Sequence, residues 1–302
     1  MTQVANLVRW FDQEQKARRQ QLLAQWRGPL FCAALALFAG GGWFAFANLG
    51  LSFGELEYAP MFALLFAIIP ATIAYSAINM VLMAHAAKVP LSFQQGVKVS
   101  VFAQVAEMLP IPGGAIVRTA ALVQAGSSTA RSAELVVGFA LLWIACGGVG
   151  AGLALWDLGL PAVLLTSASG LAMLALASWL AWCHGFPVAL AATGLRIVGV
   201  GLMAIRLSLA FAVLGATMRW VDAAAYAFAV ILGSAAAIVP AGLGASEVLA
   251  ALIAAPGGVD PALAFLAAAL SRLLGFGTNM LLALLYLLAG TRTGPSKLPE
   301  HG

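Results

Sequence analysis

Five charged side chains lie inside stretches of sequence that are otherwise apolar: Glu107, Arg118, Arg206, Glu247 and Arg272. A charge at the centre of a bilayer costs about 2.5–3.5 kcal/mol on insertion scales, so such placements indicate function or pairing. Three of these residues are arginines and two are glutamates, which leaves a surplus of positive charge. Because a planar guanidinium matches a phosphate group, we expect an anion-binding site.

A structural interpretation competes with this one. Glu107 can pair with Arg118, and Glu247 can pair with Arg272 or Arg206, only to hold the fold together. Asn79, Gln104 and Asn279 are also polar residues at membrane depth, and we expect them to form hydrogen bonds between helices rather than to bind a ligand.

Catalytic chemistry has little support in the sequence. His85 and His184 stand apart from each other and from the three cysteines, so no spacing suggests a metal site or a catalytic cluster. We expect no enzymatic activity, no metal and no cofactor. No nucleotide-binding motif is present either, so ATP use would require a separate subunit.

Two apolar segments are interrupted by helix-disrupting residues next to these charges. Residues 92–126 are broken at 110–114, where the sequence reads Pro-Ile-Pro-Gly-Gly, and residues 223–256 are broken at 240–244, where it reads Pro-Ala-Gly-Leu-Gly. Interrupted helices survive at depth only where protein or a wet cavity satisfies the backbone. In each segment a second half-helix begins at the break, and its free N–H groups favour an anion. We therefore add Gly113, Gly114, Gly244 and Ala245 to the predicted substrate-binding site.

The rest of the chain reads as membrane spans. Of its 302 residues, 63% are hydrophobic and 9% are charged, which nearly excludes a soluble domain. We predict six spans of about 20 residues or more, the length that a bilayer requires: 29–49, 59–84 with a kink at Pro70, 135–156, 158–183, 197–218 and 262–289. Residues 1–28 resemble an amphipathic helix lying in the headgroup layer, without a cleavable signal peptide, and 291–302 form a cytoplasmic tail.

The two breaks suggest an internal duplication. Aligning them matches Pro110 with Pro240 and Gly114 with Gly244, so that 29–157 form a first repeat and 158–290 a second. If each broken segment is a re-entrant hairpin, each repeat crosses the membrane three times and the second repeat is inverted. The predicted fold is thus an all-α polytopic membrane protein of two inverted repeats.

The basic residues favour that topology. With hairpins, Lys88, Lys98, Arg131 and Arg196 lie on the inner side with the basic N-terminus, and only Arg219 lies outside. If each broken segment instead crosses once, Arg131 and Arg196 move outside. We expect a multi-pass protein of the cytoplasmic (inner) membrane with both termini cytoplasmic. The basic residues look like topology signals, so we expect no nucleic-acid partner.

The second break carries a resemblance to a known family. Pro240-Ala241-Gly242-Leu243-Gly244-Ala245-Ser246-Glu247 resembles the Pro-Gly-Gly-Leu-Gly-x-x-Glu signature of the lysylphosphatidylglycerol synthase transmembrane-region family. The first break, a proline-rich turn followed by Arg118, is similar to the partner motif of that family. The resemblance extends over nearly all of 29–289, with Ala241 where a second glycine is usual.

That family includes the flippase half of the bacterial multiple peptide resistance factor, so the resemblance implies lipid translocation. We expect no soluble aminoacyl-transfer domain after the last span, and therefore no synthase activity. We therefore predict a flippase-like transporter whose substrate is a membrane lipid with an anionic or zwitterionic headgroup. The alternative is a secondary transporter for a small soluble anion. A homo-oligomer or a lipid-biosynthesis partner is left open.

Overall fold

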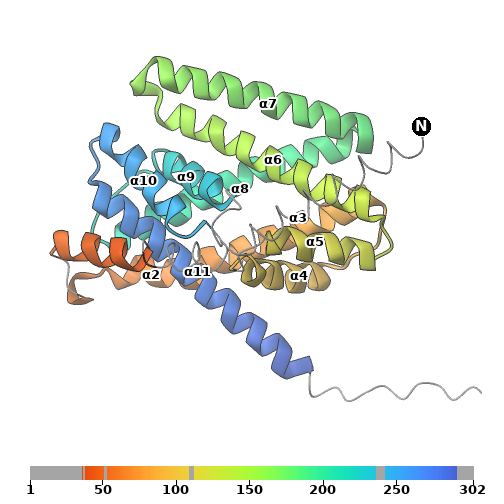
Figure 1. Ribbon diagram of the computed structural model, residues 1–302, viewed down its shortest axis with the longest axis horizontal. Helices are drawn as coiled ribbons and strands as arrows, with labels where there is room; N and C mark the ends of the chain where they lie inside the picture. The colour runs from red at the N-terminus through yellow and green to blue at the C-terminus, as the bar shows by residue number, and fades with distance from the viewer. Residues whose placement is uncertain (1–35, 37, 51–52, 109–111, 236–241, 291–302) are drawn as a thin grey trace, which may run out of the picture.

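The computed structural model describes residues 36–290 except 37, 51–52, 109–111 and 236–241, and these residues form helices and turns without a strand (Figure 1). The segments predicted over 1–28 and 291–302, the start of the first span, and Pro110 and Pro240 lie outside the described residues. Five helices are long and apolar enough to cross a membrane. The all-α prediction is thus confirmed for the described residues, and the helices are compatible with a polytopic membrane protein.

The first of these long helices contains the predicted distortion. It runs as α2 (Tyr58–Ala63), a π-helical turn (Leu64–Ile68) and α3 (Ile69–Ala87). Pro70 has no N–H to donate to the carbonyl four residues earlier, and the wider π turn lies directly before it. Before this helix, residues 38–48 are helical, and Ala45 packs against Phe265 and Ala269.

Four further long helices follow, and one prediction about them is wrong. α6 (Thr129–Ala154), α7 (Leu160–His184) and α11 (Pro261–Gly290) lie close to the predicted spans. α8 (Phe186–Val213), however, begins well before Ile197 and ends before Met218. Only Gly185, at φ 96°, separates α7 from α8, and Pro187 stands in the first turn of α8, where a missing N–H costs nothing. Arg196 is therefore inside a helix and not in a cytoplasmic loop.

Both interrupted segments are helical hairpins. The first comprises α4 (Phe93–Ala106) and α5 (Gly113–Gln124), and the second comprises α9 (Ala223–Ala235) and α10 (Ala245–Ala254). The longest of the four has 14 residues, about 21 Å at 1.5 Å per residue, short of the ~30 Å hydrocarbon core. In each hairpin the two helices pack along one another. This arrangement favours the hairpin topology over a single crossing.

Glycines permit the close approach within each hairpin. A Cβ at Gly113 would lie 2.0 Å from the carbonyl oxygen of Ala106, and one at Gly242 would lie 2.2 Å from that of Gly233. Gly242 also has φ 66°, a conformation that a side chain disfavours. Glycine is thus required at Gly113 for space, and at Gly242 for space as well as for backbone conformation.

The two hairpins lie toward opposite ends of the molecule, along its long axis (Figure 1). At the α4/α5 end, Arg131 Nη2 donates to the carbonyl of Ala86 at 2.9 Å, and the His184 ring contacts the same oxygen. At the α9/α10 end, the amide of Glu57 donates to the carbonyl of Val213. These contacts gather the helix ends into two opposite loop regions.

Candidate functional site

A cavity of about 500 Å³ lies between α3, α6 and α8 and is bordered by the two hairpins. Its wall meets α6 around Ala140 and α8 around Gly199, near the middle of each helix. The polar side chains in the wall come from α3, both hairpins and α8: Thr72, Tyr75, Ser76, Asn79, Gln104, Glu107, Arg118, Arg196, Arg206 and Ser234. A polar chamber therefore lies midway along helices that are otherwise apolar.

The α4/α5 hairpin contributes an ion pair and a helix N-terminus. Arg118 Nη2 lies 3.0 Å from Glu107 Oε1, and both side chains are partly exposed. The Glu107 carboxylate lies against the first turn of α5, where a Cβ at Gly114 would come within 2.4 Å of it. Glu107, Gly113, Gly114 and Arg118 all line the cavity, as the sequence predicts, and the predicted pairing of Glu107 with Arg118 is confirmed.

Arg196 is the residue that the sequence-based prediction missed. It is 6% exposed, donates from Nη1 to the hydroxyl of Tyr75 at 2.9 Å, and lies 5.5 Å from the ring centroids of Phe139 and Trp143. Aromatic faces stabilise a cation by their quadrupole, but they leave its charge uncompensated. Pro187 could have shown that the helix starts well before Arg196, because proline favours the first turn of a helix. The prediction instead took the charge of Arg196 as the end of a membrane span.

Arg206 also lines the cavity and lies further along α8 than Arg196. Its Nη2 donates to the carbonyl of Ser271 in α11, and its guanidinium occupies the space beside Gly275, where a Cβ would come within 2.1 Å of Nη2. Across the described ranges, no carboxylate forms an ion pair with Arg196 or Arg206. The predicted pairing of Glu247 with Arg206 is therefore not the one adopted.

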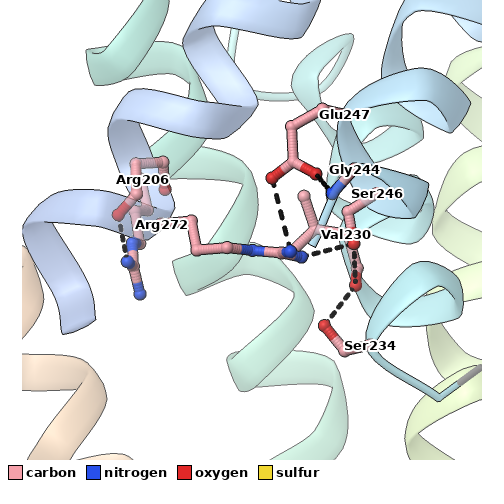
Figure 2. Close-up of polar contacts among 8 residues, drawn as sticks. Arg206, Val230, Ser234, Gly244, Ser246, Glu247 and Arg272 are labelled. Carbon is pink, nitrogen blue, oxygen red and sulfur yellow. Dashed lines mark hydrogen bonds and ion pairs between the residues drawn. The ribbon is translucent and has the colours of Figure 1, made fainter. Parts of the chain in front are cut away.

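Glu247 pairs instead with Arg272, away from the cavity wall. Figure 2 shows Arg272 reaching from α11 to the α9/α10 hairpin, where Nη1 lies 3.3 Å from Glu247 Oε1 and Nη2 donates to the hydroxyl of Ser246. The Arg272 and Glu247 side chains are 5% and 0% exposed. The Glu247 carboxylate also accepts from the amide of Gly244 at 2.8 Å.

This geometry corrects part of the predicted site. Arg272, Glu247, Gly244 and Ala245 do not line the cavity, and the N-terminus of α10 is capped by its own Glu247. Only the N-terminus of α5, and not that of α10, therefore lines this cavity. The reason is that Glu247 stands at the third position of α10, where a carboxylate folds back onto the first free amide.

The charges at this depth do not balance. Among the described residues at this depth there are four guanidinium groups but only two carboxylates. The guanidinium groups belong to Arg118, Arg196, Arg206 and Arg272, and the carboxylates to Glu107 and Glu247. The cavity wall itself carries three arginines and one glutamate. An anion with two negative charges would neutralise it. No group of three or more His, Cys, Asp or Glu gathers within the described ranges to hold a metal.

The predicted roles of the uncharged polar residues are confirmed in part. Asn279 Nδ2 donates to Gln104 Oε1 at 2.6 Å, which joins α11 to α4. Asn79 is 8% exposed and lines the cavity, and its Oδ1 accepts no hydrogen bond from the described residues. Gln104 and Asn279 therefore form an interhelical hydrogen bond as expected, and Gln104 and Asn79 both line the cavity.

No protein-family model matches this chain, and no curated protein matches it. The function is therefore inferred from the cavity and its charges.

Proposed function

We propose that this protein is a flippase-like transporter that moves a lipid with an anionic headgroup across the membrane. The observation that carries the proposal is the mid-helix cavity, whose wall holds three arginines against one glutamate. A phosphate entering this chamber compensates charges that otherwise cost several kcal/mol to keep at depth. The resemblance of the two break motifs to a lipid-translocating family supports the same conclusion.

Two groups of charged residues have different roles, one in binding the headgroup and one in holding the fold. Arg118, Arg196 and Arg206 bind the headgroup together with the first turn of α5. The Arg272–Glu247 pair holds the α9/α10 hairpin to α11 and does not touch the lipid. The two hairpins belong to inverted repeats, 29–157 and 158–290, which rock about the cavity and expose it to each side in turn. No step of this cycle requires enzymatic chemistry.

The proposal is tested by replacing the arginines that lack a carboxylate partner. In proteoliposomes containing a fluorescent phosphatidylglycerol, Arg196→Gln and Arg206→Gln should each lower the transfer rate by roughly tenfold or more, because each removes a charge-assisted bond worth about 1.5–3 kcal/mol. Arg196→Lys should retain part of the activity, since it keeps the charge and loses only the planar fork. Transfer is measured by quenching of the outer-leaflet fluorophore.

Arg219→Gln is the matched control, because Arg219 is exposed in a loop and bonded to Asp222. Its transfer rate should equal that of the unmodified protein, and the thermal unfolding midpoint of every variant should be recorded. Unchanged lipid transfer in well-folded Arg196 and Arg206 variants would exclude the flippase proposal. Uptake of inorganic phosphate instead of lipid would support the alternative, a transporter for a small soluble anion.

A further inference from the structure

An apolar groove of about 450 Å³ runs between α5 and α6 on the outside of the molecule. One wall is formed by Ile116, Ala120 and Val123 of α5, and the other by Ala133, Val136 and Val137 of α6. Ile116 and Val137 are 51% and 55% exposed, so the groove faces the surroundings of the protein. Among the described residues, its polar lining comes from two threonine side chains, Thr119 and Thr129.

The groove adjoins the cationic cavity. Ala115, Val136 and Val137 line both spaces. Along α6, the groove residues Ala133 and Val137 continue on the same helical face into Ala140 and Leu141, which line the cavity and are exposed. The two spaces therefore adjoin each other at α5 and α6, close enough for one molecule to reach both.

The two adjoining spaces differ sharply in chemistry. The inner one holds a surplus of guanidinium charge, and the outer one offers almost only hydrocarbon. A soluble anion would use the first and leave the second empty, and a partner helix would fill the second without using the charge. An amphiphile with an anionic group joined to a hydrocarbon tail fits both. Its tail remains in apolar surroundings throughout, so only the headgroup changes its environment.

We propose that the groove between α5 and α6 is the lateral opening through which the lipid reaches the cavity, with one acyl chain lying in the groove while the headgroup meets Arg118 and Arg196. The inference rests on the proposed function, since it takes the anion in the cavity to be a lipid headgroup. It adds a route and a binding place for the tail. It also gives the α5 half-helix a second role, because Gly113, Gly114 and Arg118 line the cavity while Ile116, Ala120 and Val123 line the groove.

Photo-crosslinking locates the tail directly. Phosphatidylglycerol with a diazirine at the end of one acyl chain is incorporated into vesicles with the full-length protein, irradiated, and the modified peptides are mapped. Crosslinks should concentrate on 115–123 and 129–137. Ala120→Phe and Ala133→Phe, which fill the groove, should each lower this crosslinking and the transfer of long-chain phosphatidylglycerol at least fivefold. Binding of soluble glycerol 3-phosphate in the cavity should be unchanged in both variants.

Ala168→Phe is the matched control, because Ala168 is an exposed alanine of α7, away from both spaces. It should leave crosslinking and transfer as they are. Crosslinks on other helices, in a protein whose transfer still depends on Arg196, would overturn the lateral opening and leave the proposed function intact. Transfer that is insensitive to both Arg196→Gln and Ala120→Phe, or an absence of crosslinks at groove and cavity alike, would overturn both.

Discussion

Single arginines at membrane depth have two kinds of partner in this protein. Arg272 is neutralised by Glu247 and hydrogen-bonded to Ser246, in a place with almost no exposure. Arg196 has a hydroxyl and two aromatic faces around it, and it lines an open chamber. The charge of Arg272 is balanced within the protein, whereas the charge of Arg196 has no carboxylate partner among the described residues and can bind an anion. Arg196 and Arg272 are equally buried, at 6% exposed each, so pairing with a carboxylate, rather than burial or residue type, separates the structural arginine from those expected to bind a ligand.

We expect Arg272→Ala to destabilise the protein by about 3–5 kcal/mol, because it leaves the fully buried Glu247 carboxylate without its counter-charge. The double variant Arg272→Met with Glu247→Gln removes both charges and should recover most of that loss. Thermal unfolding in detergent, followed by circular dichroism, measures both. A double variant no more stable than Arg272→Ala would contradict the assignment of the pair as a structural contact.

The hairpin is the element that places groups in the cavity. In each one the two helices approach closely, and each depends on glycine where they do so: Gly113 against Ala106, and Gly233 against Ser246. In the first hairpin this approach sets Glu107, Gly114 and Arg118 side by side in the wall. The distance between the two half-helices therefore controls the geometry of this part of the site.

Gly113→Ala should push α4 and α5 apart, since its Cβ would meet backbone rather than a side chain that can move away. We expect a loss of about 1–3 kcal/mol in stability, the usual range for overpacking, together with reduced phosphatidylglycerol transfer. Gly170→Ala in α7 provides the control, as a Cβ there meets nothing within 4 Å and should be neutral or slightly stabilising. Equal unfolding midpoints for the two variants would contradict a tight hairpin.

At the scale of the whole molecule, the two ends differ in charge. Lys88, Lys98 and Arg131 lie toward the end with the α4/α5 hairpin. The loops of the other end hold Glu55, Glu57, Asp157, Asp222 and Asp260 together with Arg219. Basic loops stay in the cytoplasm, so this asymmetry predicts a cytoplasmic α4/α5 end. Arg196 lies inside α8 and is not a loop charge, and the remaining basic residues still predict a cytoplasmic α4/α5 end.

Cysteine labelling tests this orientation. In a background with Cys32, Cys146 and Cys183 replaced by Ala, Thr217→Cys in the loop before α9 should react with an impermeant maleimide on intact cells. Gln94→Cys, at the start of α4, should react only after the cells are permeabilised. The reverse pattern would place the α4/α5 end outside, and labelling of both sites on intact cells would contradict the hairpin topology.

Much of the architecture could be predicted because it depends on local properties of the chain. Apolar runs of sufficient length predicted the long helices, and Pro-Gly clusters predicted the starts of α5 and α10 close to where they lie. The pairs Glu107–Arg118 and Glu247–Arg272 were among the predicted pairings, since charges buried at one depth have few partners. The start of α8 was predicted wrongly, because a charge inside a helix looks the same in sequence as a charge at its edge.

By itself, the sequence determined that this chain is helical and membrane-embedded in character, where its helices break, and that more arginines than carboxylates lie at depth. Only the tertiary structure decided which of those arginines share a chamber. Arg196, predicted in a loop, lies in the cavity wall, whereas Arg272, predicted in the binding site, forms a buried ion pair. The physical reason is that span length and turn chemistry act over a few residues, whereas a cavity and its net charge arise from side chains of several helices distant in sequence. Whether a charge is compensated depends on what those neighbours present to it.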